Sequence, residues 1–525
     1  MDGCKNAVLP AQKYFNPQYK VSSYKGVKTT LSKKLGDELP LNAQRTVYIH
    51  SKNSNVFTIE EIYNILGAKP SAEDLRIFGD VYKQPVSGFA NRRIDLTEGG
   101  IAFIYKHINY QDEKILIRPS DLLEKHVALV VDTKLHETIP TIVVDDVAHA
   151  FHVLTKAARD KFDPLTVAVT GSVGKTTTKD MLKGIFNSHC KTLCIYGNNN
   201  SLATLPLIVQ KLQVDDKAYI QEVHGGTINA AKTTSELISP NIAIITAITA
   251  SHLGQMGSME AVVQGKMDIT AGMNPDGVLV LNDDSPELHN QHPNVRVCRY
   301  SLSNPECDFY ASDIHVEGDY SKFKIISKGG EFDAPGIYEA RLNIQGTHNV
   351  LNAVGAFAVA RIAGIPPYSI IASLARFRTE GDRQNVVEVN GAKFLIDVYS
   401  TSQLSVLTAV ETLEKIEKPD YGRRIVVLGD LTDLGEASRK VHEDTGRKLA
   451  KYDFDYLLSF GEESLPLVSE LRKLGRKAFY FETRDTFNQV LQELIKPGDV
   501  VLFKASSRFD FKGKTISPIY GNISK

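Results

Sequence analysis

The segment TVAVTGSVGKTTTKDML, residues 166–182, holds the side chains in this chain best suited to chemistry. Its apolar start predicts a buried strand, its two glycines predict a tight turn, and Lys-Thr-Thr predicts the start of a helix. Strand, glycine turn and helix in this order form the context of a P-loop. The glycines let backbone N–H groups face phosphate oxygens, and the helix N-terminus adds partial positive charge.

The turn is shorter than the full P-loop pattern, because Val169 stands at the position of its first glycine. We still expect Lys175 to reach the β- and γ-phosphates of a nucleotide and Thr176 to offer its hydroxyl to Mg²⁺. The alternative is an ordinary glycine turn between a strand and a helix. The residues predicted to bind the phosphates are Gly171, Ser172, Val173, Gly174, Lys175, Thr176 and Thr177.

Three further side chains follow from the predicted strands and helices. Glu222 ends the apolar run AYIQEV, His252 follows IAIITAITAS, and Lys266 lies in SMEAVVQGKMDIT. The carboxyl ends of parallel strands share one edge of a sheet, so Glu222 and His252 are expected beside the P-loop, where a carboxylate can hold a metal ion. Taken singly, each has a simpler explanation: a salt-bridged or capping glutamate, a loop histidine and a solvated lysine.

Composition limits the class of protein. The chain has 525 residues, 42% hydrophobic and 23% charged, with a formal net charge of −1, as in a globular protein of about three domains. This charge gives no reason to expect nucleic-acid binding, and no apolar run is long enough to span a membrane. The five cysteines are few and scattered, and MDGCKNAVLPAQKYF lacks the apolar core of a secretory signal, so we expect reduced thiols and a cytoplasmic location.

The order of apolar runs predicts an α/β fold with three domains. Residues 1–55 are polar and weakly patterned, an N-terminal extension that could be a tail or an extra lobe. Residues 56–160 predict a small α/β substrate-binding domain, and residues 161–370 a central P-loop domain with a mainly parallel sheet. Residues 371–525 open with a hairpin at Asn390-Gly391 and continue as a doubly wound, Rossmann-like domain.

Several spaced segments together resemble one family. They are TGSVGKTTTKDML, GNNNSLATLP, ASHLGQMGSMEAVVQGKMDI, GTHNVLNA and VVLGDLTDLGEAS. Over residues 56–525 the chain resembles the Mur ligases, ATP-dependent enzymes that add amino acids or dipeptides to peptidoglycan precursors. It is most similar to the branch that adds D-alanyl-D-alanine.

The resemblance implies a role for each matching residue. Lys175, Glu222, His252, Lys266 and Arg383 would be catalytic. ATP would be bound by the P-loop with Asn349 and Asn352 near the adenine, and by Arg383 and Asp397 as the domains close. Mg²⁺ would be held by Thr176, Glu222, His252 and a carbamylated Lys266. The substrate contacts would be Asn91, Arg92, Asn198, Asn200 and Tyr399.

The implied reaction is amide formation through an acyl phosphate, with an acid such as a UDP-linked muramyl peptide, an amine such as a dipeptide, and a monomeric enzyme. The helix-capping and surface alternative for Asn349 and Asn352 stays open, as does a surface ion pair for Arg383 and Asp397. The substrate motifs depart from the family pattern: Ser201 and Thr204 replace an asparagine and a glycine, and the family's DSYNANP reads DVYSTSQ. Two other functions remain: a non-catalytic ATP-binding subunit or regulator, and a P-loop kinase.

Overall fold

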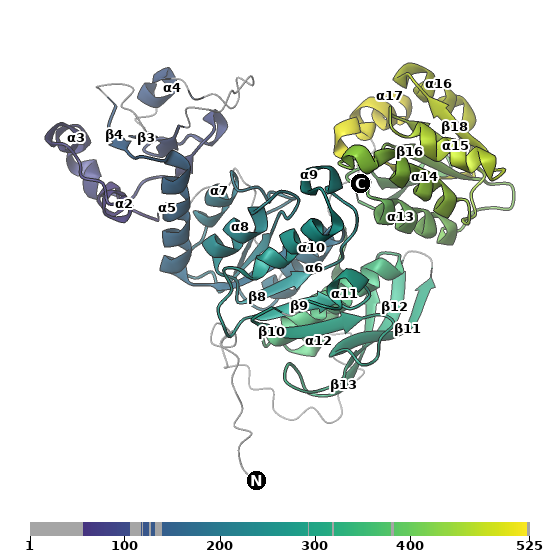
Figure 1. Ribbon diagram of the computed structural model, residues 1–525, viewed down its shortest axis with the longest axis horizontal. Helices are drawn as coiled ribbons and strands as arrows, with labels where there is room; N and C mark the ends of the chain where they lie inside the picture. The colour runs from purple at the N-terminus through teal and green to yellow at the C-terminus, as the bar shows by residue number, and fades with distance from the viewer. Residues whose placement is uncertain are drawn as a thin grey trace, which may run out of the picture.

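The computed structural model describes residues 56–104, 117, 119–124, 128–131, 139–291, 293–317, 320–379 and 383–521. In these ranges the chain forms three sheets that follow one another along the sequence, joined by helices (Figure 1). The α/β class and the three-domain architecture are therefore confirmed. The exact domain bounds stay a prediction, and the extension 1–55 lies outside the described residues.

The first sheet has four parallel strands. They are β1 (Phe89–Ala90), β2 (Ile101–Phe103), β3 (Ala128–Val131) and β4 (Thr141–Val143). Before them come α2 (Ile59–Leu66), α3 (Ala72–Phe78) and a 3₁₀ turn, η3 (Gly79–Lys83); η4 (Arg93–Asp95) and α4 (Pro119–Glu124) lie between the strands. Helix α2 is capped by Thr58, whose side chain and that of Glu61 form a capping box, and it ends at Gly67 in the left-handed conformation.

The second sheet has nine strands in the order β13-β12-β11-β10-β9-β8-β5-β7-β6. The strands are β5 (Leu165–Thr170), β6 (Thr192–Cys194), β7 (Ala218–Glu222), β8 (Ile242–Ile245), β9 (Val278–Asn282), β10 (Arg296–Ser301), β11 (Phe309–Glu317), β12 (Tyr320–Ser327) and β13 (Gly336–Leu342). Pairing is parallel from β6 to β11 and antiparallel from β11 to β13. The predicted, mainly parallel sheet therefore ends in antiparallel strands on one side.

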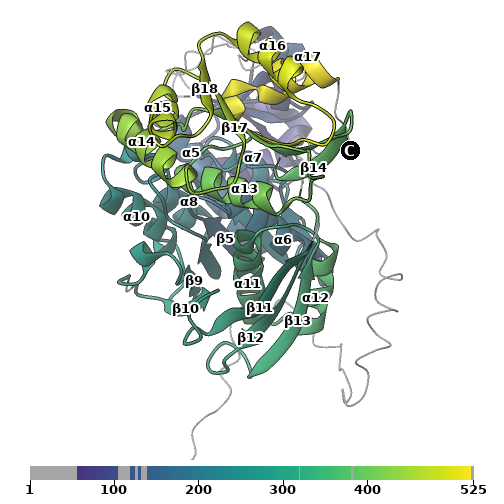
Figure 2. The same ribbon diagram turned by 90° about the vertical axis from the view of Figure 1, so that its right-hand side faces the viewer.

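Helices cover both faces of this sheet. One core joins it to α6 (Lys175–Asn187), α11 (Thr347–Ile362) and α12 (Pro367–Arg376), and Figures 1 and 2 both show α11 beside β9 to β11. The opposite core joins it to α5 (Val147–Phe162), α7 (Leu205–Val209), α8 (Ala230–Ile238) and α10 (Met259–Met267), and continues into the first sheet. The burial of both faces explains the uninterrupted apolar runs of the central strands.

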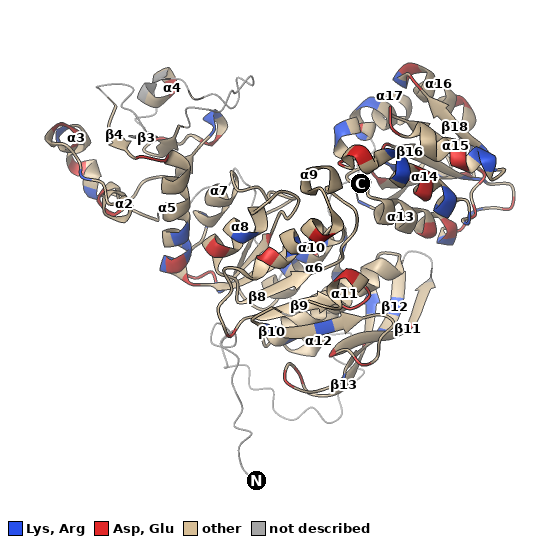
Figure 3. Cartoon of the chain, in the orientation of Figure 1, with Lys and Arg blue, Asp and Glu red and all other residues tan. Residues whose placement is uncertain are grey.

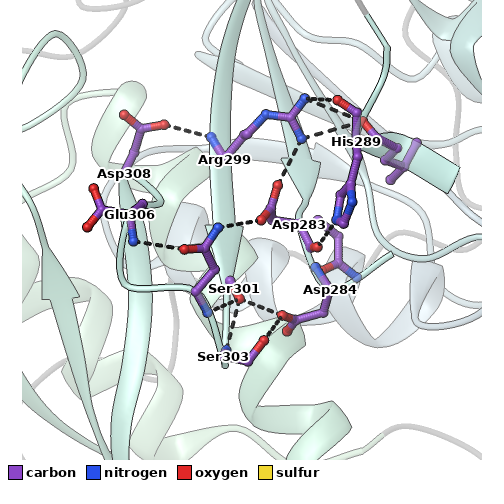
Figure 4. A network of polar contacts seen from close by, with 11 residues as sticks. Asp283, Asp284, His289, Arg299, Ser301, Ser303, Glu306 and Asp308 are labelled. Carbon is purple, nitrogen blue, oxygen red and sulfur yellow. Dashed lines mark hydrogen bonds and ion pairs between the residues drawn. The ribbon is translucent and has the colours of Figure 1, made fainter. Parts of the chain in front are cut away.

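A polar network joins the loops that follow β8, β9 and β10 (Figure 4). Asp283 accepts hydrogen bonds from Arg299 (3.0 Å) and Asn304 (2.7 Å), and Asp284 accepts from the Ser301 hydroxyl (2.5 Å). Asn282, at the end of β9, donates to the backbone carbonyl of Thr246 (2.5 Å). The network thereby fixes the loop after β9 against the loop after β8, which leads to His252.

The third sheet has the order β14-β15-β19-β16-β17-β18. Its strands are β14 (Asn385–Val389), β15 (Ala392–Asp397), β16 (Arg424–Gly429), β17 (Tyr456–Phe460), β18 (Ala478–Phe481) and β19 (Val500–Lys504). One face packs on α13 (Gln403–Lys415), α14 (Ser438–Leu449) and α15 (Leu465–Lys473), and the other on α16 (Arg484–Leu494) and α17 (Ser517–Tyr520). Asn390 (φ 50°) and Gly391 (φ 77°) form the predicted hairpin turn between β14 and β15.

The distribution of charged residues and the length and polarity of the helices agree with the composition. Basic and acidic residues are interspersed over the helices rather than gathered by sign (Figure 3). None of the helices in the described ranges has the length and apolar character that crossing a membrane requires. Cys190, Cys194, Cys298 and Cys307 are free thiols, and Cys4 lies outside the described residues.

Candidate active site

The P-loop lies between β5 and α6, as predicted. Gly171 (φ 146°) and Gly174 (φ 84°) adopt backbone conformations that L-residues rarely reach, which explains the glycine at each position. The Thr246 hydroxyl donates to the carbonyl of Val173 (2.5 Å), and the N–H of Ser172 donates to the carbonyl of Ala247 (2.6 Å). The loop is therefore held by the segment that follows β8, and its shape is set before any ligand binds.

The ammonium of Lys175 folds back over the loop. It donates to the carbonyls of Gly171 (2.8 Å) and Ser172 (3.2 Å). Burial lowers the pKa of Lys175, while the carboxylate of Glu222 acts in the opposite direction. A phosphate group in the loop would offer this cation stronger acceptors than the two carbonyls.

Glu222 is buried at the end of β7 and meets the P-loop directly. Its carboxylate accepts from the Thr176 hydroxyl (2.7 Å) and from the Asn200 amide (2.9 Å). The simpler explanations, a helix cap or a salt bridge, are wrong, because a neutral hydroxyl and a neutral amide hold this carboxylate. Thr176 and Glu222 offer oxygen ligands of the kind that Mg²⁺ takes from proteins.

Lys266 is not the solvated lysine of the simpler explanation, because its side chain is 1% exposed. Its ammonium donates to the carbonyl of Gly225 (2.6 Å), and a Cβ at Gly225 would lie 2.9 Å from the Lys266 Cδ. Burial, and after it the positive charge of Lys175, lowers the pKa of Lys266 to about 7. A lysine in this state is largely a neutral, nucleophilic amine near physiological pH.

His252 lies in the left-handed conformation (φ 60°) just before the short helix α9 (Leu253–Met256). Its ring stands edge-on to that of His224, with 5.3 Å between centroids. Burial, and then the charge of Lys266, lowers the pKa of both rings, that of His252 to about 4. Both imidazoles are therefore neutral at pH 7, the form that can accept a proton or bind a metal ion.

The C-terminal domain brings Arg383, Tyr399 and Asp397 to the same place. The Arg383 guanidinium stacks on the Tyr399 ring, 3.8 Å from its centroid. Asp397 is buried and pairs with Lys504 (3.0 Å). The alternative of an exposed ion pair between Arg383 and Asp397 is therefore wrong: each has a different partner.

Asn349 and Asn352 are both buried in the first turns of α11. Asn349 donates to the carbonyl of Gln345 (2.6 Å) and to the side chain of Gln384 (3.0 Å), and a Cβ at Gly174 would lie 2.6 Å from the Asn352 side-chain oxygen. The helix-cap and surface alternative is thus wrong for this pair. Their predicted position near an adenine stays a prediction.

Two adjoining cavities lie where the central and C-terminal domains meet. One, of about 430 Å³, is lined by the P-loop with Glu222, His252, Arg383 and Asp397. The other, of about 550 Å³, extends past Tyr399 toward Tyr196 and Phe511. The residues that line both are Thr176, Asn198, Arg383, Tyr399 and Ser507. A molecule bound in the larger cavity would therefore have access to a phosphoryl group held beside Thr176.

The predicted substrate residues of the first domain lie apart from these cavities. Asn91 is buried and its amide donates to the carbonyl of Ala203 (3.0 Å), while Arg92 forms an ion pair with Asp95 (2.6 Å). Neither residue lines the cavities described above. Asn91 contacts the site only indirectly, since Ala203 belongs to the same loop as Asn198 and Asn200.

Some residues of the site were not predicted individually. His224 follows Glu222 by two positions and faces His252, and Thr246 holds the P-loop. Asp433 pairs with Arg508 (2.9 Å) and lies 3.7 Å from the His252 ring nitrogen Nδ1. Asp433 lies in the motif VVLGDLTDLGEAS, so the sequence marked its loop without indicating its partner.

The phosphate-binding loop and the two joined α/β domains define a nucleotide-dependent enzyme, and comparison with known proteins agrees. The family described as "Mur ligase middle domain" matches residues 169–360, and "Mur ligase, glutamate ligase domain" matches residues 382–507. The UDP-N-acetylmuramoyl-tripeptide–D-alanyl-D-alanine ligase of Haemophilus influenzae is 30% identical over 356 residues, 66% of this chain and 74% of that protein.

Solved structures show the same fold. MurF from Acinetobacter baumannii superposes with a TM-score of 0.75 at 23% identity, covering 86% of this chain and 99% of that one. MurF from Thermotoga maritima, solved in complex with ADP, gives a TM-score of 0.68 at 22% identity, covering 80% and 94%. The chain belongs to the Mur ligase family of ATP-dependent, amide-forming ligases.

Proposed function

We propose that the chain joins the carboxylate of a peptidoglycan-precursor-like acid, such as a UDP-linked muramyl peptide, to the amine of a dipeptide or amino acid, using ATP. The single observation that carries this proposal is the convergence of Lys175, Thr176 and Glu222 with Arg383 and Asp397 around one cavity. Groups from two domains therefore surround one cavity, an arrangement that suits transfer of a phosphoryl group from ATP to a second substrate.

Different residues would act in the two steps of this reaction. The P-loop N–H groups and Lys175 hold the phosphates and stabilise the charge of the γ-phosphoryl group during transfer. The acid's carboxylate attacks that phosphorus and ADP leaves. The amine then attacks the acyl phosphate, and inorganic phosphate leaves as the amide forms. Arg383 lines both cavities, so it can contact the phosphoryl group and the second substrate in turn.

Mg²⁺ fits this site, and Thr176 and Glu222 would hold it, with His252 beside them. Mg²⁺ commonly takes only one or two protein carboxylates and completes its shell with phosphate oxygens and water. This agrees with the finding that no three His, Cys, Asp or Glu side chains in the described ranges form a ready metal cluster. When bound, the ion would neutralise phosphate charge.

The decisive experiment is phosphate release with ATP, Mg²⁺ and bicarbonate, with Lys175→Ala as the blank. UDP-muramyl tripeptide with D-alanyl-D-alanine is tested first, followed by panels of other acids and amines, and products are identified by mass. An amide from the first pair supports a cell-wall ligase, and turnover only with another pair supports a changed substrate. ADP formation that needs no amine and leaves the phosphoryl group on the acceptor, with no free phosphate, would favour a kinase. Tight ATP binding without turnover would favour a non-catalytic subunit.

A further inference from the structure

The central and C-terminal domains touch backbone to backbone at two glycines. A Cβ on Gly254 would lie 2.7 Å from the nitrogen of Gly435, and a Cβ on Gly435 would lie 2.7 Å from the Cα of Gly254. The N–H of Gly254 also donates to the carbonyl of Asp433 across this contact (3.2 Å). In Figure 1 the helix concerned, α9, lies on the side of the central domain that faces the C-terminal domain.

This contact brings a carboxylate to His252. One Asp433 oxygen pairs with Arg508 (2.9 Å), and the other lies 3.7 Å from the Nδ1 of His252. Both His252 (φ 60°) and Asp433 (φ 65°) are non-glycine residues in the left-handed conformation, one on each side of the contact. Such conformations gather at functional sites, where the surrounding structure over-determines them.

We propose that the contact between Gly254 and Gly435 sets the closed arrangement of the two domains, and that Asp433 is a positioning residue that orients the His252 imidazole in that arrangement alone. A carboxylate that accepts a hydrogen bond from one ring nitrogen fixes which way the other nitrogen points. The Asp433 oxygen and the His252 Nδ1 are 3.7 Å apart, so an approach of about 1 Å when ligands bind would form that bond. His252 and Asp433 both line the cavity that contains the P-loop. Domains within a chain move relative to one another unless a large apolar interface holds them. The site would therefore be complete only in the closed arrangement, in which Asp433 lies beside His252.

The inference rests on the proposed function, because positioning His252 matters only if the cavity carries out phosphoryl transfer. Gly254→Ala tests the contact alone. Gly254 lies in a helix and its φ is outside the left-handed region, so alanine suits its backbone and meets an obstacle only in the Leu434–Gly435 backbone. Gly435 is a poorer choice, because its φ of 55° strains any alanine.

Gly184→Ala is the matched control, since Gly184 lies inside α6 and a Cβ added there would meet no neighbouring atom within 4 Å. Gly184→Ala should melt at or above the temperature of the wild-type chain. Gly254→Ala should keep the secondary structure of both domains while it loses the contact between them. Gly254→Ala should lower kcat by at least about tenfold, because a small misplacement of reacting groups costs that much or more. Gly184→Ala should keep the wild-type kcat.

Asp433→Asn tests the positioning role separately. Asparagine accepts the left-handed conformation as readily as aspartate, so the backbone contact is kept while the charge beside His252 is lost. We expect kcat to fall about tenfold and KM for ATP to stay within about twofold. This result is expected if the variant loses an orienting group but still binds ATP normally. A wild-type kcat in Asp433→Asn would overturn the role of Asp433.

Hydrogen exchange with Mg²⁺ and a non-hydrolysable ATP analogue supplies a readout that needs no turnover. The amides of residues 253–257 and 433–437 should be protected in the wild type, Gly184→Ala and Asp433→Asn, and unprotected in Gly254→Ala. Equal protection in Gly254→Ala, or its full activity, would overturn the role of the glycine contact. If the wild-type chain makes no amide from any pair, the proposed function fails, and with it the positioning role that we assign to Asp433. The exchange pattern still shows separately whether the contact forms.

Discussion

Lys266 should react reversibly with CO₂ near neutral pH, while another buried lysine should not. With its pKa at about 7, roughly three-quarters of the Lys266 amine is neutral at pH 7.5, against about 0.1% for a lysine at the ordinary value. Only the neutral amine attacks CO₂, so the reactive fraction is several hundred times larger. The product is an anion, which turns the repulsion by Lys175 into attraction.

Lys179 is the internal control. Its ammonium is also buried, but it pairs with Asp180 (2.8 Å) and donates to the carbonyls of Ile195 (3.1 Å) and Gly197 (2.6 Å). Although burial alone would lower it, the pKa of Lys179 is raised by the surrounding negative groups, so this lysine stays protonated and unreactive. Two lysines within one domain therefore differ in reactivity because of their partners, not their exposure.

The assay is ¹³C NMR of the whole chain in ¹³C-bicarbonate across pH 6 to 10, following the carbamate carbon. One signal that is absent from Lys266→Arg should appear with a midpoint near pH 7 and persist in Lys179→Arg, whereas the N-terminal amine and ordinary lysines react only at higher pH and equally in all variants. Lys175→Met should move the midpoint of this signal upward, because the lost positive charge no longer favours the neutral amine. The reasoning would be refuted if the spectrum of Lys266→Arg equals that of the wild type at pH 7, or if the signal assigned to Lys266 has its midpoint near 10.

Three other substitutions test separate parts of the structure. Glu222→Gln keeps the shape of the contact with Thr176 but removes its charge, so phosphate release should fall by about 100-fold or more while ATP still binds by calorimetry; unchanged release would exclude Glu222 as a metal ligand. Gln210→Ala removes the partner of both Phe89 backbone groups (2.5 and 2.9 Å) and should cost on the order of 2–4 kcal/mol in denaturant unfolding, with early proteolysis of the first domain. His442 accepts the Leu431 N–H (3.0 Å), and burial lowers its pKa below 6.5. The unfolded chain therefore binds a proton first as pH falls through 6.5, stability is lost on that side, and His442→Gln should flatten the pH dependence of melting below 6.5.

The elements that carry the site could be predicted because local signals and burial agree. The P-loop glycines and the Asn390-Gly391 turn adopt backbone conformations that few other residues could adopt. The apolar run before Glu222 indicates a buried strand, and the structure contains one there. The positions of Glu222 and His252 at one sheet edge then follow from parallel topology, which alternating strands and helices indicate.

Pairings across domains could not be predicted in the same way. Asp433 meets His252 across 181 residues of sequence (433 − 252), and nothing in the spacing indicates that contact. The burial of Lys266 was also hidden, because a lysine in a helix shows no sign of the Gly225 backbone packed over it. The resemblance to a family identified His252 and Lys266 as functional, but their physical state, such as a lowered pKa, required coordinates.

The departures from the family pattern have a structural consequence that bears on substrate choice. Ser201 and Thr204 hydrogen-bond each other (3.0 Å), and Thr401 and Ser402 are used to fix the start of α13, through the Asp430 carbonyl and a capping box with Ser405. These side chains serve their own loops, whereas Asn200 keeps its bond to Glu222. In the proposed reaction, phosphoryl chemistry and substrate recognition would be carried by different residues of the same loops, so the second could change while the first is retained. A screen of acids and amines is therefore a sharper test of this chain than any variant of its P-loop.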